Sequence, residues 1–439
     1  MKKIILTILV IVLTACGRQD APMPNANVSP APTSGSTKLS ATLAPTAQST
    51  ATMQRSNEPT PLFTRANIPG FSDIQEGTNG IALADLNRDG LTDIVAIHSP
   101  PLSVLGRGAE KLRVFINQGN LHFKEHAIKI TNQKIAANEF WRNAQVPNLA
   151  DFNRDGFLDL YLTRHAPMNE GVMRRGAVAI GNTLLVSQGA WDTFEDVSEK
   201  MGVRNETGYN RQSSIGDVNK DGWLDIAVGC DNIGNAMGGL PYSRLYIFQP
   251  KGNRFEDGAF QDIGETDLVP EFGGFYHDSD KDRAGPGITL RDLDNDGALD
   301  LIQSYHVDVR EPLLPYSPGE YAQGIFVWKN LLAETGAFKF QRITDNGLAE
   351  YGKLKYNQEK QIYEPVAIGP GLPYLAMVDV DNDGLLDVLA IGPSDPGWSP
   401  RAEPISGRFY RNIGDFKFQR ATTEAGLDAL NWTYREWWK

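Results

Sequence analysis

Asp85-Leu86-Asn87-Arg88-Asp89-Gly90-Leu91-Thr92-Asp93 is the first of five closely related segments in this chain of 439 residues. The other four occupy residues 151–159, 217–225, 292–300 and 379–387, and all five obey the pattern D-x-[DN]-x-D-G-x-x-D. They begin 66, 66, 75 and 87 residues apart. Recurrence at this spacing predicts a repeat architecture in which each unit carries one acidic loop.

Each loop contains the residue types that a hard cation binds. Positions 1, 3 and 5 place side-chain oxygens inside one tight turn, and the glycine at position 6 allows the reversal. Calcium takes roughly 6–8 oxygen ligands, whereas magnesium keeps several waters and a strict octahedron, so we expect about five calcium ions. The predicted ligands, with a backbone carbonyl at position 7, are Asp85, Asn87, Asp89, Leu91, Asp93, Asp151, Asn153, Asp155, Phe157, Asp159, Asp217, Asn219, Asp221, Trp223, Asp225, Asp292, Asp294, Asp296, Ala298, Asp300, Asp379, Asp381, Asp383, Leu385 and Asp387.

Two other interpretations of the loops are an EF-hand and an acidic turn that binds no metal. An EF-hand would need a bidentate glutamate at position 12. Turns without metal also favour Asp, Asn and Gly. The carboxylates, three or four in each loop, repel one another unless a divalent ion lies among them, which favours the metal interpretation. The EF-hand is excluded because the residues at position 12 are Ala96, Leu162, Val228, Gln303 and Ala390.

Each loop lies within a recurring series of four predicted strands. In the first unit we expect these strands at residues 80–84, 93–97, 112–119 (a strand together with its turn) and 123–126. The second strand starts at the closing aspartate and is a short apolar run, which is typical of a buried strand. Four short strands per unit predict an all-β fold, a β-propeller of four-stranded blades.

The five units resemble the FG-GAP/VCBS repeat family, whose members form integrin-α-like β-propellers with calcium between strands 1 and 2. The unit endings, such as Gly202-Val203 and Gly426-Leu427, are similar to those of cartilage-acidic-protein/UnbV-like secreted proteins. The resemblance implies a propeller over residues 61–439. Integrin-type propellers have seven blades, but five units predict five, with six or seven as alternatives. Residues 62–67 or residues 431–439 would supply a strand that closes the ring.

The beginning of the chain predicts export and a membrane anchor. Residues 1–15 combine two lysines with an apolar run too short to span a membrane, which is typical of a signal peptide. Leu13-Thr14-Ala15-Cys16 resembles a bacterial lipobox, and the resemblance implies that Cys16 is lipidated. Because the residue after Cys16 is Gly17 rather than an aspartate, the lipoprotein resemblance implies that the anchor lies in the outer membrane of the cell envelope. Residues 16–60 are rich in Pro, Ser and Thr, so we expect a disordered tether.

Three histidines are candidates for a second site. His98, His165 and His306 lie five, six and six residues after the closing aspartate of their loops, on the face that we expect opposite the calcium. Imidazoles there could bind a transition metal or act as acid–base groups. Polar connections explain them equally simply. The acidic run at residues 277–283 lacks the loop glycine and is predicted to be a surface loop.

The remaining features favour a binding protein. The net charge of -12 and the absence of a basic patch argue against nucleic acid as a partner. We expect a monomer that binds a protein or a glycan, through insertions near residues 307–321 and 351–373 or the aromatic tail at residues 432–438. A calcium-dependent polysaccharide lyase is the alternative. Cys230 follows a predicted buried strand and is expected to be an apolar filler.

Overall fold

The structure is a computed structural model in which part of the chain is described. The described residues are 78–98, 111–132, 141, 144–164, 181–205, 210–230, 243–264, 266–270, 272, 287–304, 320–357, 362–367, 374–391, 408–422 and 424. All of them belong to one compact unit that includes residues 68–439. The predicted signal peptide, Cys16, the tether, the segment 62–67 and the tail 431–439 lie outside the described residues.

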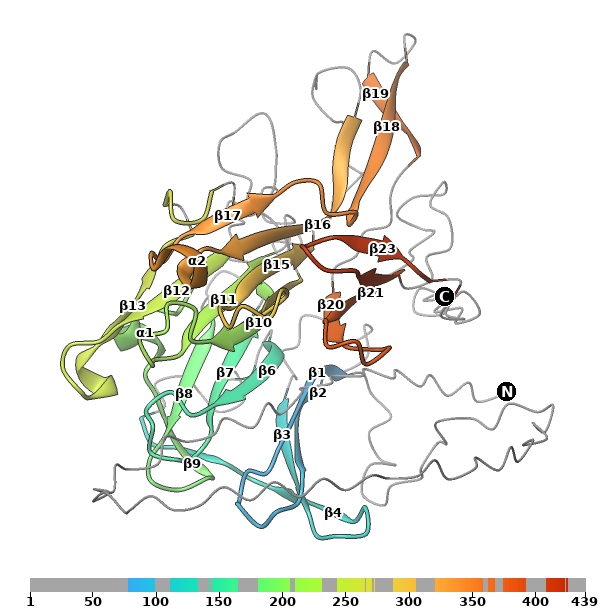
Figure 1. The fold of residues 1–439 in the computed structure, drawn as a ribbon. Coiled ribbons are helices and arrows are strands. Elements are labelled where there is room, and N and C mark those ends of the chain that lie inside the picture. Colours follow the sequence, from blue (N-terminus) through green and yellow to red (C-terminus); the bar gives the residue numbers. More distant parts are fainter. Residues whose placement is uncertain are drawn as a thin grey trace, which may run out of the picture. The chain divides into compact units, whose positions relative to one another are not determined.

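The described strands form five antiparallel sheets that follow one another along the chain, and the fold is a five-bladed β-propeller (Figure 1). Blade 1 contains β1 (Thr78–Ala84), β2 (Asp93–His98), β3 (Lys111–Asn117) and β4 (Phe123–His126). Blade 2 contains β6 (Ala144–Ala150), β7 (Asp159–Arg164), β8 (Thr183–Ser187) and β9 (Thr193–Asp196), with β5 (Lys129–Ile130) parallel to β9. Blade 3 contains β10 (Asn210–Gly216), β11 (Asp225–Cys230), β12 (Arg244–Gln249) and β13 (Ala259–Asp262).

Blade 4 contains β14 (Ile288–Arg291), β15 (Asp300–Ser304), β16 (Glu320–Asn330) and β17 (Phe340–Ile343). Blade 5 contains β20 (Tyr374–Val378), β21 (Asp387–Ile391), β22 (Arg408–Asn412) and β23 (Phe418–Arg420). Short helical turns occur at α1 (Ser198–Met201), η3 (Phe255–Asp257) and α2 (Leu332–Thr335). The predicted all-β fold and the predicted count of five blades are confirmed.

One extension departs from the prediction. Residues 351–373 were predicted to be an insertion, and no strands were predicted there, but β18 (Ala349–Asn357) and β19 (Ile362–Ala367) form a hairpin that pairs with the first half of β16. A sheet can be extended by backbone hydrogen bonds alone, so these strands need no strong apolar alternation to form. The expected insertion at residues 307–321 is described only from Glu320, where β16 begins.

In blades 2, 3 and 4 the second strand is buried on both faces. Every described residue of β7, β11 and β15 is buried. This is the result of neighbouring blades packing face to face, and it explains why these strands are continuous apolar runs rather than alternating ones. Cys230, the last residue of β11, is fully buried, in agreement with its predicted role as a filler.

Four apolar clusters correspond to four consecutive blade junctions. At the junction of blades 2 and 3, Phe152 packs against Phe255 and Phe260, with ring centroids 6.4 and 6.2 Å apart. The other three clusters join blades 1 and 2, blades 3 and 4, and blades 4 and 5. Within the described ranges no such cluster joins blade 5 to blade 1.

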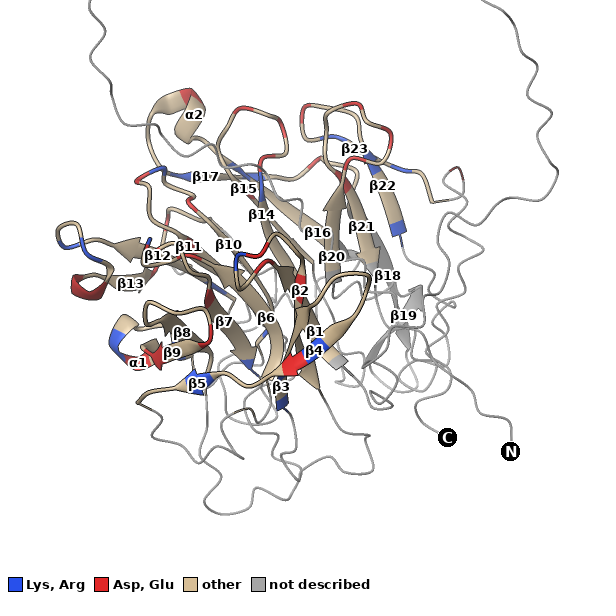
Figure 2. Cartoon of the chain, turned by 90° about the horizontal axis from the view of Figure 1, so that it is seen from below, with Lys and Arg blue, Asp and Glu red and all other residues tan. Residues whose placement is uncertain are grey.

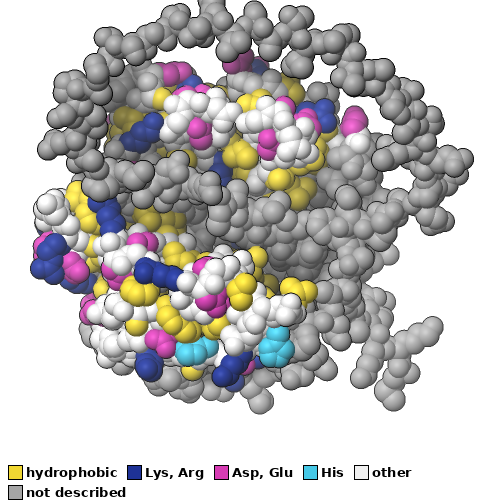
Figure 3. Space-filling view, turned by 60° about the horizontal axis from the view of Figure 1, so that its bottom comes forward, with side chains coloured by type: hydrophobic (Ala, Val, Ile, Leu, Met, Phe, Trp, Pro, Cys, Tyr) yellow, Lys and Arg dark blue, Asp and Glu magenta, His cyan; other side chains and the backbone are white. Residues whose placement is uncertain are grey.

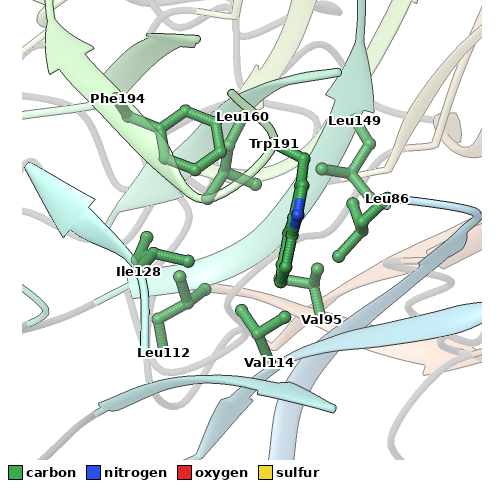
Figure 4. A pocket seen from close by; sticks show the side chains of 9 residues that line it. All are labelled: Leu86, Val95, Leu112, Val114, Ile128, Leu149, Leu160, Trp191 and Phe194. Carbon is green, nitrogen blue, oxygen red and sulfur yellow. The ribbon is translucent and has the colours of Figure 1, made fainter. Parts of the chain in front are cut away.

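The junction of blades 1 and 2 contains a small void of about 10 Å³, roughly the space of one water molecule. Figure 4 shows Trp191 lying among apolar side chains from both blades. The void is lined by Leu86, Val95, Leu112, Val114, Ile128, Leu149, Leu160, Trp191 and Phe194. It is a gap in the packing, too small for a ligand.

Among the described residues, the large apolar side chains that are exposed belong to the first and last blades. Leu121 of blade 1 is 55% exposed, whereas Phe416, at the same place in the turn of blade 5, is 5% exposed and packs in the cluster with blade 4. Val380 of blade 5 is 51% exposed, whereas Leu293, at the same loop position in blade 4, is 1% exposed. Their counterparts in the other blades are therefore covered by a neighbouring blade, whereas Leu121 and Val380 are not covered by a described residue.

We predict that the two turn residues differ strongly in their contribution to stability. Phe416→Ala should lower the free energy of unfolding by about 3–5 kcal/mol, because it leaves a cavity between blades. Leu121→Ala is the matched control, since both residues have positive φ, 54° and 59°, and it should change stability by no more than about 0.5 kcal/mol. Urea unfolding measures both, and equal losses would contradict the assignment of Phe416 to a junction.

Candidate metal centres

The five acidic loops adopt one backbone conformation. The residue at position 4 is in the left-handed region in every loop, with φ between 56° and 64°. The glycine at position 6 has φ between 84° and 90°. A left-handed arginine or lysine is uncommon, so its recurrence shows that the five sequences specify the same turn. In Figure 2 the acidic residues, coloured red on the cartoon, recur along the loops of the blades.

The carboxylates at positions 1 and 5 organise the turn through backbone N–H groups. In the first loop Asp89 and Gly90 donate their N–H groups to the two oxygens of Asp85, at 3.0 and 2.8 Å. Leu91 donates its N–H to Asp89 Oδ1 at 2.9 Å. The same three bonds recur in the other four loops. Each carboxylate oxygen has a second lone pair that these bonds do not use.

The closing aspartate at position 9 has a structural role that the sequence analysis did not predict. Asp93 is fully buried, and its Oδ2 accepts the N–H of Leu86 at 2.9 Å, while its Oδ1 accepts the N–H of Asn117 at 2.8 Å. Asn117 is the last residue of β3. In every blade the closing carboxylate thus joins the loop to the third strand. Backbone N–H donors leave no mark in the sequence, so no signal could have identified them.

Burial changes the acidity of these closing carboxyls. Desolvation raises the pKa of all five, although hydrogen bonds from the backbone lower it. The pKa reaches about 7 for Asp159 and Asp225 and about 8 for Asp300. A nearby divalent cation favours the ionised form and opposes this effect. The residues therefore fit a cation on electrostatic grounds.

Two loops bring three carboxylates close enough to share one ion. Asp292, Asp294 and Asp300 in blade 4 have carboxylate oxygens that all lie within 4.8 Å of one another. The equivalent residues of blade 5 form the second triad, Asp379, Asp381 and Asp387. Both triads could hold a metal ion. The first three loops have asparagine at position 3, which offers an amide oxygen in place of the third carboxylate.

Neighbouring loops contact each other through position 4. The Arg88 guanidinium lies 4.0 Å from the ring centroid of Phe157, and that of Arg154 lies 3.7 Å from the ring centroid of Trp223. In blade 4, Asn295 Nδ2 donates to the carbonyl of Gly384 at 2.8 Å. Sequence reasoning missed these contacts, although a basic residue at position 4 followed by an aromatic one at position 7 of the next loop was a visible signal.

Little of the predicted histidine site can be located. His98 is half-buried at the end of β2. His165, His306 and the acidic run 277–283 lie outside the described residues. Figure 3 shows charged side chains of both signs interspersed with apolar ones on the face that it displays. Among the described helices, none is long and apolar enough to cross a bilayer.

No protein-family model matches this chain, and no curated protein matches it. Among solved structures, a lectin from Agrocybe aegerita that recognises non-reducing terminal N-acetylglucosamine is similar with 16% identity and a TM-score of 0.40, over 77% of this chain and 64% of the lectin. The exo-beta-1,3-galactanase 1,3Gal43A from Clostridium thermocellum is similar with 9% identity and a TM-score of 0.37, over 78% of this chain and 60% of the enzyme.

An endo-1,4-beta-xylanase from Bacteroides thetaiotaomicron is similar with 10% identity and a TM-score of 0.34, over 78% of this chain and 96% of the enzyme. This chain spans less than two thirds of the length of the lectin and of the galactanase. At these identities and TM-scores, the similarities carry no inference about what the chain binds or about its activity.

The structural role of the closing aspartate can be tested without any cation. In metal-stripped protein, Asp225→Asn should lower the free energy of unfolding by about 1–3 kcal/mol, because the amide nitrogen cannot accept the buried N–H that the carboxylate accepts. Asp221→Asn, at exposed position 5, should change it by no more than about 0.5 kcal/mol. Denaturant titrations in chelator give both values. Equal stabilities of the two variants would show that position 9 serves only the cation.

Proposed function

We propose that this chain is a calcium-braced β-propeller of the FG-GAP/VCBS type. The two carboxylate triads of blades 4 and 5 carry the proposal. Three carboxylates within one small volume, one of them buried, repel one another strongly unless a cation lies among them. The first three loops have the same backbone and hydrogen bonds, and they offer two carboxylates and an amide oxygen at positions 1, 3 and 9. The donors are all oxygen, the ligand type that calcium prefers.

The proposed role is binding of a protein or a glycan by a rigid scaffold at a membrane surface. Calcium would hold each loop against its third strand and so fix the blade ends. Recognition is assigned to the opposite ends of the second strands, where His98 lies, because loops on rigid scaffolds commonly carry specificity. The lipobox resemblance at Cys16 supports attachment to the bacterial outer membrane through a lipid.

Calcium titration of the metal-stripped chain tests the bracing role. Isothermal titration calorimetry should detect about five bound ions, and saturation should raise the melting temperature, because an ion bound only by the folded state stabilises it. Magnesium at the same concentration should stabilise less. Asp379→Asn should weaken the binding of one ion. A melting temperature that calcium leaves unchanged would refute the bracing role.

The binding role needs a separate measurement. The calcium-loaded chain should bind at least one member of a panel of immobilised glycans and surface proteins, and chelation should weaken that binding because the blades lose the stability that the ions supply. A variant with Asp292→Asn and Asp379→Asn controls for effects of the chelator on the panel itself. Failure to bind any member, with calcium sites intact, would leave the bracing role standing and contradict the binding role.

A further inference from the structure

The last two loops differ from the first three at position 3, where aspartate replaces asparagine. In the first loop Asn87 Nδ2 donates to Asp89 Oδ2 at 2.9 Å, and the second and third loops have the same bond at 3.0 Å. An ionised aspartate has no N–H to donate, so positions 3 and 5 then present two carboxylates to each other. Blades 4 and 5 therefore contain a repulsion that the first three blades lack.

A lysine occupies the place of the missing donor in blade 4. Lys329 Nζ lies 2.7 Å from Asp294 Oδ2 and 3.7 Å from Asp296 Oδ2, and its side chain is 15% exposed. It also contacts Glu334 Oε1 at 2.6 Å and lies 5.4 Å from the ring centroid of Phe416.

An arginine makes the equivalent contact in blade 5. Arg411 Nε lies 2.9 Å from Asp381 Oδ2, with the arginine side chain 46% exposed. Its greater exposure means that solvent screens this pair more than the pair in blade 4. Both basic residues come from the third strand of their own blade, β16 and β22.

The two basic residues occupy one structural position. Each directly precedes the residue whose N–H binds the closing aspartate, which is Asn330 in blade 4 and Asn412 in blade 5. In the first three blades the same position is filled by a buried aliphatic residue, namely Ile116, Val186 and Ile247. A basic residue therefore occurs here only where position 3 of the loop is aspartate.

We infer that Lys329 and Arg411 set the cation affinity of their loops by cancelling the charge of the aspartate at position 3. The first three loops have three carboxylates each and no ion pair to any of them among the described residues. The last two have four carboxylates, and in each of them one basic residue pairs with the aspartate at position 3. Because ligand charge tunes calcium affinity, each basic partner offsets the gain in affinity that the additional carboxylate would otherwise bring.

The lysine does not replace the cation. Its ion pairs are to Asp294 and Asp296, at positions 3 and 5 of the loop. In the first three loops the same two positions are joined by the asparagine amide. No ion pair among the described residues joins it to Asp292 or Asp300, the other members of the triad. Asp292 and Asp300 thus have no ion pair to this lysine, and Asp294 pairs with it through Oδ2 only.

This inference rests on the proposed calcium sites, and the test separates the two. Competition titration with a chromophoric chelator gives the number and affinity of calcium sites in the full chain. Lys329→Met should make one site bind calcium about tenfold more tightly. The substitution removes the ammonium that pairs with Asp294 and so leaves one uncompensated negative charge close to the ion. Adding Asp294→Asn to Lys329→Met should restore the wild-type affinity, because it recreates the arrangement of the first three loops. Arg411→Met should have a smaller effect of the same sign.

Two further variants serve as controls. Asn87→Asp adds an uncompensated carboxylate to the first loop and should tighten one site, which keeps the test valid if Lys329→Met does not fold. Arg254→Met removes a positive charge that pairs with Glu256 rather than with a loop aspartate, and it should leave all affinities unchanged. Wild-type protein without calcium binding would refute the proposed function. The inference alone would be refuted if Lys329→Met left the calcium affinity unchanged or lowered it, or if a site existed only in that variant.

Discussion

A buried carboxylate with two backbone donors is the interaction on which each blade depends. The closing aspartate accepts one N–H from its own loop and one from a third strand that lies 23 to 30 residues further along the chain. A buried anion is costly unless its oxygens are satisfied. Both donors are therefore needed for the loop to close, and the loop conformation is coupled to the position of the third strand. The rest of the acidic turn is built around this anchor.

The sequence predicted the blade architecture well because the acidic loop is a rigid marker of register. Once the loop is located, the second strand must begin at position 9, as it does at Asp93 and in the other four blades. The hairpin β18–β19 was not predicted, because backbone pairing to β16 needs no particular side chains. Inter-loop contacts were missed for a different reason. They join residues 69 positions apart, such as Arg88 and Phe157, and such pairs become neighbours only when blades are stacked.

The predicted metal ligands divide into two groups with different duties. Positions 1 and 5 direct their oxygens to the N–H groups of the turn. The residue at position 1 is half-buried in every loop, whereas position 5 is exposed in all loops but that of blade 4. Position 9 is buried and holds the third strand, so sequence reasoning was incomplete in treating it as a ligand only. Position 3 varies between asparagine and aspartate, and the third strand varies with it at Lys329 and Arg411. That dependence involves residues about 30 positions apart, which a single loop pattern cannot reveal.

The strand pairing on both sides of each loop decides what a cation can do there. The residue before position 1 pairs directly with the closing aspartate in all five blades, as Ala84 does with Asp93. Both ends of the turn are thus fixed by one antiparallel ladder, and the third strand fixes position 9 from the side. A helix-flanked loop can reorient its helices when calcium binds, but these loops have no free element to move. A cation at this site changes the charge balance and the stability of a blade while leaving its arrangement in place.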